Sequence, residues 1–113
     1  MAKPLNFNTI KKQYWTITLP DKKKTTLMIG TPTGAILEEL IAIQDTLSDV
    51  DESNITADDL KSLHIVCAKV MNRNKGGIVI KGEQLADIFD FEDIKIFMSE
   101  YMNFVSEVMS SKN

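Results

Sequence analysis

The 113-residue sequence is poor in the residues that build metal sites and covalent cross-links. It contains one cysteine, Cys67, and one histidine, His64. One cysteine cannot form a disulfide within the chain, and with one histidine it cannot complete a four-ligand zinc site. No hydrophobic run approaches the roughly 20 residues of a membrane span, and the first six residues contain no signal-like apolar stretch. These absences predict a cytoplasmic protein with a reduced thiol, no bound metal and no membrane partner.

Basic charge is also scarce. The chain has thirteen lysine and arginine residues and sixteen acidic residues, so its net charge at neutral pH is −3. Basic residues cluster only at positions 11–12 and 22–24, and we interpret the second cluster as a solvated hairpin turn. Nucleic-acid binding normally needs a dense basic surface. No nucleic-acid partner is therefore expected, and a small DNA-binding regulator is the less favoured alternative.

The hydrophobic pattern predicts one α+β domain, mostly helical, over residues 13–113, after a flexible N-terminal arm at residues 1–12. A proline-containing turn joins two runs rich in β-branched and aromatic residues, which predicts a β-hairpin at residues 14–29. Helical periodicity follows at about residues 33–47, 56–74, 82–89 and 91–109, and the apolar tripeptide 78–80 is predicted as a third strand fragment. Because an isolated hairpin is marginal in water, we expect it to pack on these four helices.

Polar residues at the expected helix starts support these boundaries. Thr33 can cap the first helix, and Thr56 can cap the second in a capping-box arrangement with Asp59. Asp90 is placed to cap the last helix. Most of the paired acidic residues lie at such helix starts or in the connector at residues 48–54. Capping and solvation therefore explain them without a catalytic role.

The sequence shows no catalytic or phosphate-binding motif. The one candidate for nucleophilic chemistry is His64 with Cys67, because residues three apart share a helical face and a Cys–His pair can act as a nucleophile. The alternative is a histidine at the rim of the core beside a buried thiol. We favour that reading and predict a non-enzymatic protein with no catalytic residues and no cofactor, acting through its surfaces.

The last predicted helix is more apolar than a helix facing one core needs. Eleven of the nineteen residues from 91 to 109 are apolar. All but Ile96 fall in one arc of about 160°, whereas a core-facing stripe needs little more than about 100°. The surplus predicts contact with a second copy or with a client. The expected partner-binding residues share this arc: Phe97, Met98, Tyr101, Met102, Phe104 and Val108.

The order of these elements resembles the tail assembly chaperones of long-tailed phages and prophages of Gram-positive bacteria. The resemblance covers nearly all of residues 14–113 and is carried by packing patterns. The segments that carry it are residues 14–21 (YWTITLPD), 27–33 (LMIGTPT), 37–41 (LEELI), 70–75 (VMNRNK), 89–94 (FDFEDI) and 101–105 (YMNFV).

This resemblance implies a function in building a phage tail. Members of the family are thought to coat the tape measure protein before the tail tube polymerises around it, and then to leave. The tape measure protein is therefore the expected partner, with the tail tube protein as a further one, and the chain is expected to form a homo-oligomer. The implied location is the cytoplasm of the bacterial host, with no copy in the mature virion. The alternative is a structural tail or connector component that the virion retains.

Overall fold

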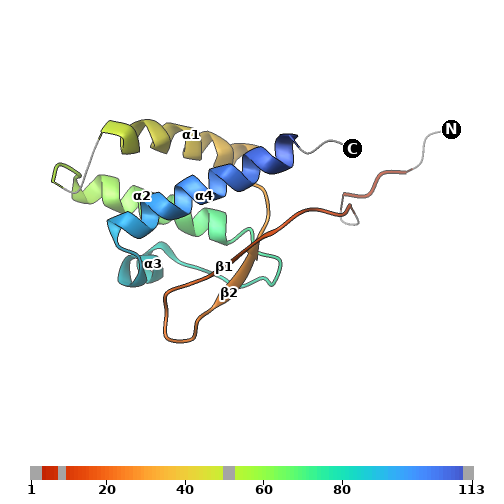
Figure 1. The fold of residues 1–113 in the computed structure, drawn as a ribbon, viewed down its shortest axis with the longest axis horizontal. Helices are drawn as coiled ribbons and strands as arrows, with labels where there is room; N and C mark the ends of the chain where they lie inside the picture. The colour runs from red at the N-terminus through yellow and green to blue at the C-terminus, as the bar shows by residue number, and fades with distance from the viewer. Residues whose placement is uncertain (1–3, 8–9, 50–52, 111–113) are drawn as a thin grey trace.

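The computed structural model describes residues 4–7, 10–49 and 53–110, and its architecture is α+β and mostly helical. An antiparallel hairpin of β1 (Trp15–Thr18) and β2 (Thr26–Ile29) is followed by four helices (Figure 1). These are α1 (Gly34–Asp49), α2 (Ala57–Met71), α3 (Gly82–Ile88) and α4 (Phe91–Ser110). The predicted hairpin and four helices are confirmed.

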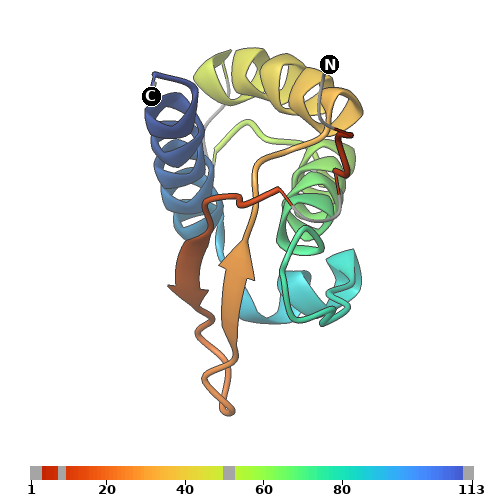
Figure 2. The same ribbon diagram turned by 90° about the vertical axis from the view of Figure 1, so that its right-hand side faces the viewer.

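The central element is α2, which contacts α1, α3, α4 and β2. In the end-on view, α1 crosses above α2 and α4, while the hairpin and α3 lie on the lower side (Figure 2). Side chains of α2 supply much of the core, including the fully buried Leu63, Cys67, Val70 and Met71. A helix with neighbours on several sides needs a wide apolar face, and the sequence of α2 provides one.

The hairpin buries one face against the helices. Leu27 and Ile29 of β2 are buried, while Met28 between them is exposed, as the two-residue period of a strand requires. They pair across the ladder with Ile17 and Trp15 of β1. The Trp15 ring lies 5.5 Å from the ring of Phe97 and 5.8 Å from that of Tyr101. Aromatic packing therefore joins β1 to α4.

The three predicted capping side chains, Thr33, Thr56 and Asp90, each accept a hydrogen bond from a backbone amide. The Ile36 amide donates to Thr33 Oγ1 at 3.3 Å, and the Asp59 amide donates to Thr56 Oγ1 at 3.0 Å. At α4 the capping is reciprocal. The amide of Asp93 donates to Asp90 Oδ1 at 2.8 Å, and the amide of Asp90 donates to Asp93 Oδ2 at 3.0 Å. These bonds satisfy amides that have no partner within the helix.

The largest differences from the sequence prediction lie at the end of α2 and in the segment that follows it. The helix ends at Met71 rather than near residue 74, because residues 73–75 run beside β2. There the Gly30 amide donates to the Arg73 carbonyl at 3.0 Å, and the Lys75 amide donates to the Met28 carbonyl at 2.8 Å. The third segment on the hairpin is therefore 73–75, which forms a single bridge between Ile29 and Asn74.

The prediction of a strand fragment at residues 78–80 is wrong. Two asparagine side chains hold this segment. Asn72 Nδ2 donates to the Ile80 carbonyl at 2.9 Å, and the Ile80 amide donates to Asn72 Oδ1 at 2.7 Å. Asn74 makes the same reciprocal pair with Ile78, at 2.6 and 2.9 Å. Each primary amide thus takes the place of a strand backbone, so the segment is fixed without a ladder.

Candidate protein-binding surfaces

The six α4 residues that the sequence predicted to bind a partner fall into a buried group and a half-buried group in the structure. Phe97, Met98 and Tyr101 are buried in the core of this chain. The Tyr101 hydroxyl also donates to the Gly30 carbonyl at 2.8 Å, and burial raises the pKa of this phenol above its ordinary value. A partner of the folded chain can therefore touch at most the small exposed part of Phe97, and it cannot reach Met98 or Tyr101 without displacing the core.

Of the other three α4 residues, Met102 and Phe104 lie at the two margins of the apolar arc, and Val108 lies within the arc near the end of the helix. Met102, Phe104 and Val108 are half-buried, and the Phe104 ring stacks on Trp15 with 6.3 Å between centroids. Ile96, the one apolar residue outside the predicted arc, is exposed. The core of the chain thus takes most of the wide arc, and Met102, Phe104, Val108 and Met109 remain partly or largely at the surface.

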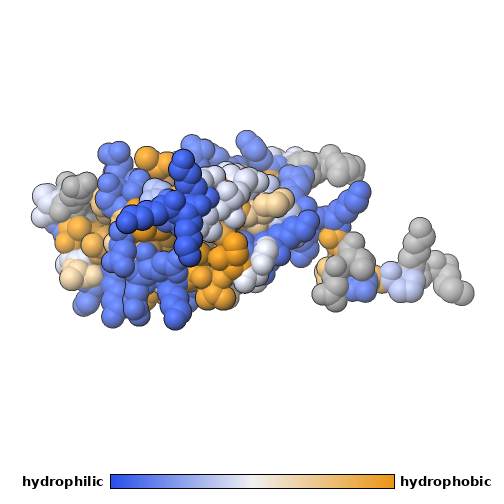
Figure 3. All heavy atoms as spheres, turned by 90° about the horizontal axis from the view of Figure 1, so that it is seen from below, coloured by the Kyte–Doolittle hydropathy of each residue, from blue (hydrophilic) through white to orange (hydrophobic). Residues whose placement is uncertain are grey.

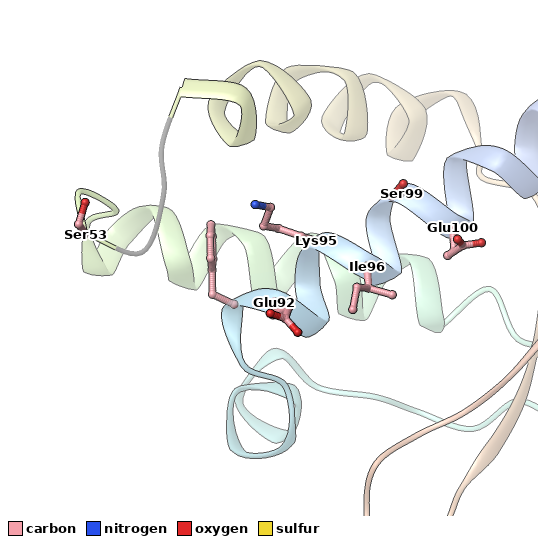
Figure 4. A pocket seen from close by; sticks show the side chains of 7 residues that line it. Ser53, Glu92, Lys95, Ile96, Ser99 and Glu100 are labelled. Atoms are coloured by element: carbon pink, nitrogen blue, oxygen red, sulfur yellow. The ribbon is translucent and has the colours of Figure 1, made fainter.

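A hollow of about 670 Å³ lies on the outer face of α4 (Figure 4). Phe91 and Ile96 give it apolar patches, and the Lys95 ammonium lies 5.7 Å from the centre of the Phe91 ring. The rest of its lining is polar: Ser53, Glu92, Ser99 and Glu100. An apolar partner would find few matching side chains here.

The groove between α2 and α3 is more apolar and measures about 440 Å³. Leu60 and Ile65 from α2 line it, and Gly82 brings the start of α3 close to α2. A Cβ atom at Gly82 would lie 3.4 Å from Ile65 Cγ1. The remaining residues of the lining are Ala57, Lys61, His64, Glu83 and Ala86. Small and aliphatic side chains from two helices thus form the floor, with one lysine and one glutamate among them.

His64 lies in this groove lining, and its Nε2 is buried without a hydrogen-bond partner in the described part of the chain. Cys67, one turn further along α2, has no exposed surface, and burial raises its pKa from 9.0 to about 12. Such a thiol stays protonated at neutral pH. The geometry therefore supports the reading of His64 and Cys67 as packing residues.

A third groove, of about 270 Å³, runs between β1 and α4. Its apolar lining includes Trp15, Ile17, Phe89 and Phe97, with Ile96 shared with the hollow on α4. Asp93 and Glu100 are the only charged residues in the described lining of this groove. Figure 2 shows β1 at the outer side of the hairpin, below α4.

The apolar surface of the molecule is divided into patches. Seen from the side of the hairpin turn and α3, hydrophobic patches are interrupted by hydrophilic side chains (Figure 3). Within the described ranges, no helix is long and apolar enough to cross a membrane, and no cluster of three or more His, Cys, Asp and Glu side chains could hold a metal ion.

The comparisons with known proteins give no relative. No family model, curated protein or solved structure matches this chain. The function is therefore inferred from these surfaces together with the resemblance carried by the sequence.

Sequence reasoning missed the α2–α3 groove because it depends on how two short helices meet. One signal was present: Ile65 lies on the opposite side of α2 from the buried residues Leu63, Val66, Cys67, Val70 and Met71. An isoleucine on the polar side of a helix is common on a surface by itself. It becomes informative only when Gly82 and Ala86 are known to face it.

Proposed function

We propose that this chain is a non-enzymatic assembly chaperone that binds an amphipathic helix of a phage tape measure protein during tail morphogenesis. The family resemblance supplies the client, and the α2–α3 groove is the observation that supports binding. In this proposal the protein acts in the host cytoplasm, self-associates along its client and is absent from the finished virion.

The α2–α3 groove has the properties that a client helix needs. A groove between two helices accepts an amphipathic helix through apolar side chains at i, i+3, i+4 and i+7. Leu60 and Ile65 offer aliphatic contacts, while the small Ala57, Gly82 and Ala86 leave room for the side chains of the client.

The size of the groove suits a chaperone that must release its client. A volume of about 440 Å³ receives only a few side chains, so each copy binds weakly. Many weak contacts along one extended client give high avidity, and the client is freed when tail tube subunits compete for it. A deep pocket with slow release would oppose assembly.

Three isoleucines provide a matched test of which surface binds. Ile65 in the α2–α3 groove, Ile96 on α4 and Ile41 on α1 are 42%, 54% and 54% exposed. Because each is partly solvated, replacement by serine should leave the fold intact. Each variant is co-expressed with a helical tape measure fragment, and capture is measured by affinity purification and calorimetry.

We expect Ile65→Ser to weaken binding about tenfold or more, since one buried aliphatic side chain is worth about 1.5–3 kcal/mol. Ile41→Ser should bind as the unmodified chain does. Loss of binding with Ile96→Ser alone would move the client site to α4. Equal binding by all three variants, or no binding by the unmodified chain, would contradict the proposal. Polar substitutions of the buried Phe97 would report on stability instead.

A further inference from the structure

The N-terminal arm carries apolar side chains that its own chain leaves in water. Leu5 and Phe7 are 68% and 70% exposed, and the described arm extends away from the helices (Figure 1). Phe7 borders a hollow whose lining is mostly polar, with Lys12, Arg73 and Lys75 among its residues and Ile10 and Tyr14 as its other large apolar side chains. Two such residues on an extended segment are expected to seek another surface.

The outer edge of β1 has unused backbone hydrogen-bonding groups. Within the described residues the sheet has two strands, so no strand covers this edge. The Leu19 amide donates to the Thr25 carbonyl at 2.8 Å, and pairing continues without a bulge to Trp15 and Ile29. Because antiparallel pairs alternate, Trp15 and Ile17 direct their backbone groups toward β2, and Thr16 and Thr18 direct theirs outward.

The groove beside this edge matches the arm in shape and charge. Its floor is apolar, and the charged residues that line it are Asp93 and Glu100. The arm has the opposite charge: residues 4–13 contain Lys11 and Lys12 and no acidic residue. The α2–α3 groove has one lysine and one glutamate, so it provides no such attraction.

We propose that the arm of one copy adds to the outer edge of β1 of a second copy and places Leu5 and Phe7 in the β1–α4 groove. In strand addition of this kind, main-chain hydrogen bonds hold the added strand, and pockets receive every second side chain. Opposite residues in an antiparallel pair share a face of the sheet. Leu5 and Phe7 therefore lie opposite Leu19 and Ile17, and Asn6 lies opposite Thr18.

This arrangement deepens the self-association in the proposed function, and it requires no client. Two copies can exchange arms across a two-fold axis, with the arm of each copy on the β1 edge of the other. Closure of this kind satisfies both β1 edges at once and leaves the α2–α3 groove of each copy open.

The first test measures self-association of the full chain by sedimentation velocity, with no tail protein present. The unmodified chain should form a dimer that dissociates on dilution. The double variant Leu5→Ser with Phe7→Ser should raise the dissociation constant about a hundredfold, given two apolar side chains returned to water. Val79→Ser is the control, because Val79 is 71% exposed and lies in neither groove. A chain that stays monomeric at high concentration, or a double variant that dimerises normally, overturns the proposal.

The second test identifies the occupant of the groove. Asn6→Cys and Thr18→Cys are purified separately under different affinity tags, mixed and oxidised. The native Cys67 is buried and should not react. We expect a mixed disulfide dimer for this pair and little for Asn6→Cys with Val79→Cys. A chain carrying both substitutions that instead closes an internal disulfide at every dilution would show that the arm folds back on itself. If the double variant Leu5→Ser with Phe7→Ser loses tape measure capture while its dimerisation is unchanged, the arm binds the client instead. Either result overturns arm exchange.

Discussion

The two asparagines after α2 allow a quantitative test of how the chain holds a segment that is not a strand. Asn74 is nearly buried, and its amide makes three hydrogen bonds: to the Met71 and Ile78 carbonyls and from the Ile78 amide. Asn72 is exposed and makes two, both with Ile80. Substitution of each asparagine therefore tests the same side-chain amide hydrogen bonds at a buried position and at an exposed position.

Replacing each asparagine by alanine should lower the free energy of unfolding by different amounts. A protein hydrogen bond contributes about 1 kcal/mol net, and a buried group that loses its partner bears the full desolvation cost. Asn74→Ala should therefore cost about 3 kcal/mol. Asn72→Ala should cost about 1 kcal/mol, since water can replace its bonds. Urea unfolding at neutral pH measures both values, and a domain of this size should remain folded in each case.

Hydrogen exchange separates this explanation from general destabilisation. Asn74→Ala should speed exchange at the Ile78 amide, and Asn72→Ala should do so at the Ile80 amide, each beyond the change in global stability. Equal costs for the two substitutions, or unchanged protection of Ile78 in Asn74→Ala, would refute the assignment of these side chains as substitutes for a strand.

Three further predictions concern single side chains. Tyr101→Phe removes the bond to the Gly30 carbonyl and should lower the free energy of unfolding by about 1–2 kcal/mol in urea titrations. Burial raises the pKa of Cys67 from 9.0 to about 12, so the stability it contributes is complete below pH 9 and is lost as the pH rises toward 12. At pH 10 this loss is on the order of 1 kcal/mol. An unfolding series should therefore show a flatter pH dependence for Cys67→Ala than for the unmodified chain, and parallel curves would count against this explanation. Lys24 has a positive φ of 52°, so Lys24→Gly should raise the melting temperature through a gain of about 0.5 kcal/mol, whereas a decrease would show that this turn is unstrained.

Local signals in the sequence were sufficient for most of the fold. Proline between two β-branched runs predicted the hairpin, and Thr33, Thr56 and Asp90 located helix starts because a cap depends on neighbours only three residues away. The end of α2 could not be predicted in this way. Asn72 and Asn74 stop the helix by binding residues 78–80, and the partner segment of Arg73 and Lys75 lies more than 40 residues earlier in the chain.

The candidate site was less predictable than the fold. The apolar arc of α4 was identified correctly, and Ile96 was correctly placed outside it, but periodicity measures only the width of an apolar face. It cannot say how much of that face the hairpin will cover, and Trp15 covers the part nearest Phe97 and Tyr101. The α2–α3 groove and the β1–α4 groove both arise between elements, so no single segment encodes either of them.

The hydrogen bond from Tyr101 to Gly30 joins residues that are 71 positions apart, and this has a consequence for synthesis on the ribosome. The hairpin is made early, but its aromatic support arrives with the final helix. A nascent chain must therefore hold Trp15 without its ring partners until α4 has been synthesised. A message truncated before α4 would yield a product with an unsupported hairpin, which is a ready substrate for cellular proteases.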